Sequence, residues 1–178
     1  IDGATLHTSN NFTTTRLTTI GPGGATFDVD EVLPGADHTH NGVIQGLAGA
    51  NPFVKTGAGE MRLGGVNTFI APIHINEGTL STDASNRLGN NTNVIAFGGG
   101  TWFVDGTFGN SRTVQLNQNG GTIDVAGGFT LTQSGVIEDG ANGPAGPLTT
   151  AGGGTLRLNA ANTYSSGTNI QAGVLRLL

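Results

Sequence analysis

The chain repeats its own sequence after about 95 residues. A shift of 96 positions sets residues 1–29 on 97–125 with eight identities, and a shift of 95 sets 50–80 on 145–175 with eleven more. Between these blocks the shift falls to 93, where residues 42–44 and 135–137 both read Gly-Val-Ile. The order is the same throughout, so the chain comprises one full repeat unit, 1–96, and most of a second, 97–178. A period of this kind is the mark of a stacked architecture.

Short strand signals follow one another within each unit. Each alternates apolar with polar residues over a few positions and is bounded by Gly, Asn or Asp. Alternation places Leu156 and Leu158 on one face of a strand and Arg157 on the other. No stretch has sustained helical periodicity with caps, so helix content should be close to nil. The expected strands are 4–6, 25–29, 94–97, 101–104, 122–125, 155–158 and 168–170.

These features predict an all-β fold, a fragment of a right-handed parallel β-helix (solenoid), with 1–178 as a single segment. Glycine fills 32 of 178 positions, which suits a chain with many tight corners. A coil of about twenty residues buries its apolar face only by stacking on the next one, so eight or nine coils are expected. A β-sandwich would need two tandem domains with a linker near residue 96, where the sequence is strand-like instead.

Composition excludes several classes of function. The seven basic residues are scattered among twelve acidic ones, so no nucleic acid is expected as a partner. The chain contains no cysteine, which removes disulfides and thiolate chemistry. The glycine runs at 98–100 and 152–154 precede no helix and lack the Lys-Ser/Thr of a phosphate loop, so no cofactor is predicted.

Residues 152–175 read Gly-Gly-Gly-Thr-Leu-Arg-Leu-Asn-Ala-Ala-Asn-Thr-Tyr, then Ser-Ser-Gly-Thr-Asn-Ile-Gln-Ala-Gly-Val-Leu. This segment resembles the passenger-associated transport repeat of autotransporters, and residues 57–80 resemble it more loosely. In that first copy, Glu60, Met61, Phe69 and Pro72 depart from the pattern. The motif positions in the two copies are Gly59, Leu63, Asn67, Thr68, Phe69, Gly78, Leu80, Gly154, Leu158, Asn162, Thr163, Tyr164, Gly173 and Leu175.

The resemblance implies a β-helical passenger that is exported through the outer membrane, stays at the cell surface and carries repeats that aid export. It implies neighbouring passenger coils as partners, a host or bacterial surface ligand as a further candidate, and membrane contact only through a C-terminal barrel elsewhere in the protein. A non-catalytic stalk or adhesin scaffold is the expected role. An adhesive ligand-binding module, or the stalk of a protease or polysaccharide-active enzyme, stays open as an alternative.

Two clusters could carry chemistry. Asp37, His38 and His40 could bind a divalent metal, since residues two apart on a strand share a face. They lie in a stretch that the second unit lacks, so a polar loop tip is the favoured interpretation. A second cluster, Asp28, Asp30 and Glu31, could supply a carboxylate pair for glycoside cleavage.

The second unit keeps Asp124 in the place of Asp28 but has Ala126 and Gly127 next to it, so a corner role is simpler and no catalysis is expected.

Single residues are expected to be structural. Asn67 and Asn162 should cap corners, in a left-handed conformation and bonded to backbone two residues on. Trp102, the one tryptophan, should pack in the core or at an end. The chain opens mid-pattern at Ile1, which predicts an excised piece whose last strand, 174–178, would be covered by a further coil. Fragments are therefore expected to associate end to end.

Overall fold

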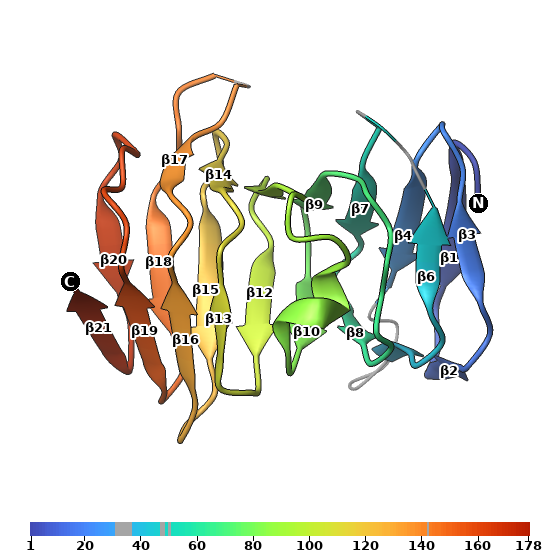
Figure 1. The fold of residues 1–178 in the computed structure, drawn as a ribbon, viewed down its shortest axis with the longest axis horizontal. Helices are drawn as coiled ribbons and strands as arrows, with labels where there is room; N and C mark the ends of the chain where they lie inside the picture. The colour runs from blue at the N-terminus through green and yellow to red at the C-terminus, as the bar shows by residue number, and fades with distance from the viewer. Residues whose placement is uncertain (31–36, 47–48, 50, 142) are drawn as a thin grey trace.

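The strands form parallel ladders in which each strand pairs with the strand one coil earlier and one coil later. The computed structural model describes residues 1–30, 37–46, 49, 51–141 and 143–178. Its parallel sheets form a β-solenoid of about 7 turns (Figure 1). The predicted all-β parallel β-helix is therefore confirmed. Each of the expected strands is present, and the coils contain 19–28 residues, from 19 between Ile95 and Val114 to 28 between Ala25 and Phe53. Because several coils exceed the predicted twenty residues, about 7 turns form in place of the expected eight or nine.

Three faces surround the core. The first sheet contains β1 (Ala4–Thr8), β4 (Ala25–Val29), β7 (Phe53–Thr56), β9 (Ile73–Ile75), β11 (Ile95–Phe97), β14 (Val114–Leu116) and β17 (Ile137–Asp139). The second sheet contains β2 (Phe12–Thr14), β5 (Asp37–His40), β8 (Glu60–Leu63), β10 (Thr79–Thr82), β12 (Thr101–Val104), β15 (Gly121–Val125), β18 (Leu148–Ala151) and β20 (Thr168–Ile170).

The third face is interrupted. It begins with the pair β3 (Thr18–Ile20) and β6 (Ile44–Gly46) and resumes with β13 (Phe108–Asn110), β16 (Thr130–Gln133), β19 (Thr155–Leu158) and β21 (Val174–Leu177). Between them lie the segment 67–71 and the 3-10 helix η1 (Ser85–Leu88). The segment 67–71 still continues the ladder, because the Thr68 N–H donates to the Ile44 carbonyl at 2.9 Å.

Period-two alternation fills the interior. In the first sheet the register aligns Phe27 with Lys55, Lys55 with Ile75 and Ile75 with Phe97, and all four side chains point inward. Burying such a ladder is the main source of stability, because every coil covers the apolar face of its neighbours. At β21 the apolar side chains are uncovered: Leu177 is 72% exposed. End-to-end association through this strand stays a prediction.

The two proposed repeat units are not in phase with the faces. Residues 100–104 align in sequence with 4–8, yet β1 belongs to the first sheet and β12 to the second. From β1, four steps along the first sheet (β4, β7, β9, β11) and one further face lead to β12. The same displacement relates β7 to β18 and β8 to β19. One repeat unit thus advances the chain by four coils and one face.

The sheets wind around the solenoid axis. In Figure 1 the second sheet runs from β2 at the lower edge of one end to β20 at mid-height of the other. This twist, which follows from the right-handed twist of strands, brings motif-equivalent strands such as β8 and β19 to similar heights in the view. No helix among the described residues is both long enough and apolar enough to cross a bilayer.

Candidate functional site

The motif glycines shape the corner that follows the first strand of each motif copy. Gly57 and Gly152 have φ of +76° and +79°. A Cβ on either would lie within 2.4 Å of a carbonyl oxygen of the previous coil, so only glycine fits. The N–H groups of Gly59 and Gly154 donate to the previous coil at 2.8 Å in both copies. The two corners therefore share one backbone design, although they lie on different edges of the solenoid.

The motif asparagines join neighbouring coils. The Asn67 Oδ1 accepts the Ile44 N–H at 2.7 Å, and its Nδ2 donates to the Arg87 carbonyl at 2.6 Å, so one side chain links three coils. The Asn162 Oδ1 accepts the Ile137 N–H at 2.8 Å in the same way. Asn67 is buried. The two residues that donate these N–H groups, Ile44 and Ile137, are the ones that the shift of 93 aligns.

The predicted conformation of these asparagines is wrong. No described non-glycine residue has a positive φ, so neither Asn67 nor Asn162 is left-handed. Their partners lie 20–25 residues away rather than two. The side chain takes the place of a backbone acceptor in the ladder, which sequence reasoning mistook for a local corner cap. Thr68 and Thr163 follow in both copies and donate their N–H groups to the same strands, β6 and β17, at 2.9 Å.

The apolar motif residues line the core. Leu63 and Leu158 are 1% and 2% exposed, which confirms the predicted burial, and Leu80 is fully buried. Phe69 stacks on Phe53 with ring centroids 5.4 Å apart. The second copy is less enclosed: Leu175 is only half-buried, as is Tyr164, whose hydroxyl contacts Thr168 at 2.7 Å. Gly78 and Gly173 form the next corner, and Trp102 is buried in the core, its Nε1 donating to Thr82 at 2.9 Å.

The loop-tip interpretation of the Asp37–His40 cluster is wrong. These residues form β5, and alternation turns His38 and His40 into the core, where they are 0% and 1% exposed, while Asp37 faces outward. Burial lowers the pKa of His38 to about 4 and lowers that of His40 as well. Among the described residues no group of three His, Cys, Asp or Glu side chains is placed to hold a metal ion. Asp37, His38 and His40 therefore do not form the three-residue metal site that the sequence offered as a candidate.

The two described carboxylates of the cluster, Asp28 and Asp30, both lie beside His7. Asp28 contacts the His7 ring at 3.0 Å and accepts from the Thr56 hydroxyl at 3.2 Å, which holds the pKa of Asp28 below its usual range. Asp30 lies 3.7 Å from the other nitrogen of His7. A general acid needs a raised pKa, whereas the pKa of Asp28 is lowered. Glu31 lies outside the described residues.

Two buried cations were missed. The Lys55 ammonium donates to the carbonyls of Thr56 and Gly57 at 2.6 and 2.8 Å, and burial lowers its pKa to about 8. The Arg112 guanidinium, 1% exposed, binds oxygens of Ser85, Gly89, Asn90 and Asn110 and so fixes η1 and its flanks. Period two in residues 53–56 already places Lys55 with Phe53 on the inner face. The sequence gives no sign that Arg112 is buried, because the repeat aligns it with another arginine, Arg16, which is exposed.

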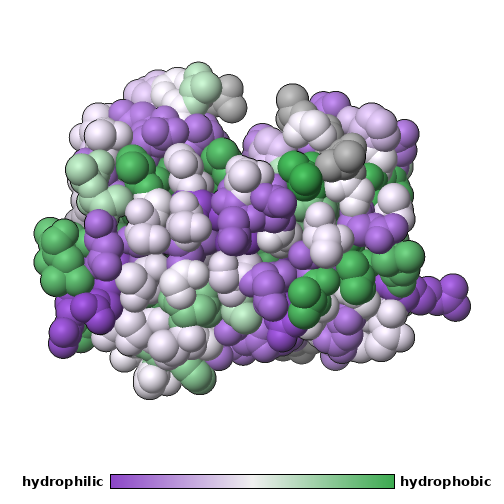
Figure 2. All heavy atoms as spheres, viewed as in Figure 1, coloured by the Kyte–Doolittle hydropathy of each residue, from purple (hydrophilic) through white to green (hydrophobic). Residues whose placement is uncertain are grey.

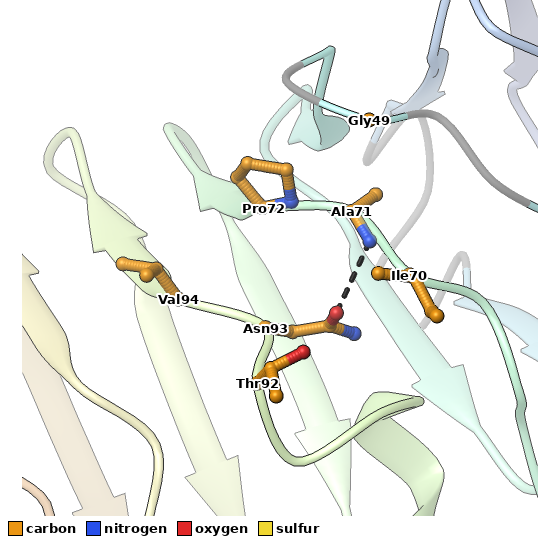
Figure 3. A pocket seen from close by; sticks show the side chains of 7 residues that line it. All are labelled: Gly49, Ile70, Ala71, Pro72, Thr92, Asn93 and Val94. Carbon is orange, nitrogen blue, oxygen red and sulfur yellow. Dashed lines mark hydrogen bonds between the residues drawn. The ribbon is translucent and has the colours of Figure 1, made fainter.

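A shallow pocket of about 140 Å³ lies beside the interruption of the third face (Figure 3). Ile70, Pro72 and Val94 form its apolar part, and Asn93 crosses its floor to accept the Ala71 N–H at 3.1 Å. The Asn93 Nδ2 also donates to the Leu88 carbonyl of its own coil and to the Phe69 carbonyl of the previous coil, so its polar atoms are used. The pocket offers no free polar group of Asn93 to a ligand.

An exposed apolar ridge marks another edge. Leu17, Val43 and Val66 occupy the same place in three successive coils and are 61%, 37% and 52% exposed. Figure 2 shows a row of apolar side chains on this part of the surface, beside β3 and β6. In the second unit the aligned positions carry Thr113, a half-buried Val136 and Ala161, so the ridge belongs to the first unit.

Comparisons with known proteins agree with this architecture. The family model of the passenger-associated transport repeat matches residues 53–81 and 148–177. The chain is 33% identical, over 96% of its length, to the adhesin BmaC autotransporter of Brucella suis biovar 1 (strain 1330), and it spans about 5% of that protein's length. No solved structure gives a significant match. The parallel solenoid, the two repeat matches and the similarity along nearly the whole chain to an autotransporter adhesin together support a passenger-domain fragment.

Proposed function

We propose that this segment is a non-catalytic scaffold at the cell surface, which holds adhesive surface away from the cell and aids export by folding coil by coil. The observation that carries the proposal is the uninterrupted second sheet, whose eight strands all pair in parallel with their neighbours in the stack. In such a stack each coil gains stability as soon as the previous coil is in place. The motif asparagines support this, because each ties its own coil to the preceding one.

Export through a narrow pore favours a fold of this kind. Each described strand pairing joins segments about one coil apart in sequence, so an emerging chain can complete each contact without waiting for a distant part. Force spectroscopy on the purified chain tests the point. Pulling from the two ends should unfold it in several steps of one or two coils each, with refolding that starts from any folded coil. A single all-or-none rip of the whole chain would contradict coil-by-coil folding.

Adhesion is the favoured use of the scaffold, because the relative is named an adhesin and the ridge of Leu17, Val43 and Val66 exposes apolar surface on three adjacent coils. Such patches are common at contact sites. The chain coupled to beads should bind host-cell monolayers, and a Leu17→Ser, Val43→Ser, Val66→Ser variant should bind less. The matched control is Ile170→Ser, which removes an exposed apolar residue of the second unit. Equal loss of binding in both variants, or no binding by the unaltered chain, would contradict adhesion through the ridge and would leave the spacer as the only remaining role.

The absence of catalysis is part of the proposal. It rests on the pairing of Asp28 with His7 and Thr56, on the burial of the His38–His40 pair and on the adhesin name of the relative. The purified chain should turn over no peptide or polysaccharide substrate. Turnover that disappears in Asp28→Asn or Asp30→Asn would refute this part, while leaving the solenoid intact.

A further inference from the structure

The His38–His40 pair is the least satisfied polar group in the described core. All four ring nitrogens are buried and none makes a hydrogen bond of normal geometry, although the Arg16 backbone lies close enough to His40 to raise its pKa in opposition to burial. A neutral imidazole has one nitrogen that donates and one that carries a lone pair. The ring of Phe12, edge-on to His38 with centroids 5.1 Å apart, can receive an N–H, and Phe27 lies similarly against both imidazoles. An aromatic ring face accepts an N–H but donates nothing to the other ring nitrogen. The lone pair of that nitrogen therefore stays unused in both imidazoles.

The two rings are spaced as ligands of one metal ion. Their centroids are 5.7 Å apart and the rings are tilted by 34°. Two imidazoles that share a metal through bonds of about 2.0 Å hold their centroids at most about 6 Å apart. The centroid separation thus lies within the range at which two imidazoles, after rotation of their rings, can bind the same ion.

A sulfur ligand lies beside them. Met61 is the only methionine of the chain, and on the adjacent coil it pairs in register with His38. Its side chain is fully buried and points into the same core. Adjacent strands lie about 4.8 Å apart, and the methionine side chain is long and flexible, so its thioether can reach an ion held between the two imidazoles.

We propose that His38, His40 and Met61 form a buried site for a single Cu(I) ion. Two neutral imidazoles and a thioether make a soft, low-coordinate ligand set, which favours Cu(I) over Mg²⁺, Ca²⁺ or Mn²⁺. Zn²⁺ is disfavoured because no carboxylate, thiolate or further imidazole among the described residues completes a tetrahedral set. The site is separate from the scaffold role and does not depend on it.

Burial determines how the ion enters. His38 and His40 are at most 1% exposed, so a folded stack must open locally, or the ion must bind while the coils around β5 assemble. A site completed only in the folded state adds its binding free energy to folding. Cu(I) present during refolding should therefore raise the Tm more than Cu(I) added briefly to the folded chain.

The experiment uses the whole purified chain, refolded anaerobically with ascorbate and Cu(I), with bicinchoninate as the competing chelator. One Cu(I) per chain is expected, with two nitrogen and one sulfur scatterers in the X-ray absorption spectrum and an increased Tm. A His38→Leu, His40→Leu variant keeps apolar volume in the core and should lose binding and the Tm increase. His74→Leu, a half-buried histidine on the first sheet, is the matched control and should bind like the unaltered chain.

Met61→Leu separates the ligands, since it keeps the core filled while removing the thioether. It should bind Cu(I) more weakly and lose the sulfur scatterer. Circular dichroism confirms that each variant is folded before its binding is compared. No binding by the refolded chain, binding unchanged in the double histidine variant, unchanged affinity in Met61→Leu, or preference for Zn²⁺ over Cu(I) would each overturn the site.

Discussion

The two transport-repeat copies, 53–81 and 148–177, build the same local structure on different faces. Both use a left-handed glycine after the first strand, and both place an asparagine that accepts an N–H from the previous coil. They differ in what they enclose: the first copy buries Phe69 and Lys55, and the second has a half-buried Tyr164 and a buried Thr150 in their places. The motif therefore specifies corners and coil-to-coil bridges, and leaves the core residue and the face to the rest of the sequence.

The leucines should give the largest effect. Leu63→Ala and Leu158→Ala each remove a side chain that is at most 2% exposed, so each should lower the free energy of unfolding by about 2–5 kcal/mol. Urea denaturation monitored by circular dichroism measures both. If either variant matched the unaltered chain, the inward assignment of that motif leucine would be wrong.

The arginines should separate the two units most clearly. Arg112→Met removes the guanidinium that binds the oxygens around η1, and the buried groups it leaves should cost about 3 kcal/mol. Arg16→Met, at the aligned exposed position, should change stability by less than about 0.5 kcal/mol. Equal effects on the urea midpoint would show that the fixing of η1 contributes little.

The asparagine bridges come next. Asn67→Ala removes one buried and one partly buried hydrogen bond and leaves the Ile44 N–H unpaired, for a loss of about 2–4 kcal/mol. Asn162→Ala removes one bond at a half-buried site, for a loss of about 1 kcal/mol. Hydrogen exchange should show faster exchange at Ile44 and Ile137 respectively. Protection that persists at both amides would contradict the bridging role.

Lys55 should make the free energy of unfolding depend on pH in a way that its counterpart Thr150 cannot. Its pKa in the folded chain, about 8, lies below the usual 10.5, because burial outweighs the attraction of Asp28, Glu77 and Asp30. The unfolded chain then binds more protons between these two values, so stability should rise with pH across that window, with a slope on the order of 1 kcal/mol per pH unit. Lys55→Thr, which installs the residue of the second copy, should lack this rise. If the free energies of unfolding of the two proteins changed with pH in parallel, the contribution of Lys55 would be contradicted.

Much of the architecture could be predicted from the sequence, and the misses have physical causes. Alternation located β15 and β19 because a half-buried strand needs a period of two. The same rule, applied to residues 37–40, would have turned His38 inward, but their polarity suggested a loop. The bridging of Asn67 could not be foreseen, because its partners come from coils whose registry depends on the length of every intervening corner.

The displacement of the two motif copies by one face is the central claim, and disulfide trapping tests it most directly. Thr79, Thr101, Thr122 and Thr149 are aligned in successive strands on the outer side of the second sheet, so they trace a path from the first copy to the second. The chain has no cysteine of its own. Cα atoms in register on neighbouring strands lie about 4.8 Å apart, within the range that a disulfide spans.

The measurement introduces cysteine pairs at 79 and 101, at 101 and 122, and at 122 and 149, and follows mild oxidation by mass spectrometry. All three pairs should form intramolecular disulfides in the folded chain, whereas Thr79→Cys with Thr149→Cys, which are separated by two strands, should not. Failure of any adjacent pair, or ready closure of the distant pair, would contradict a continuous second sheet and with it the one-face displacement.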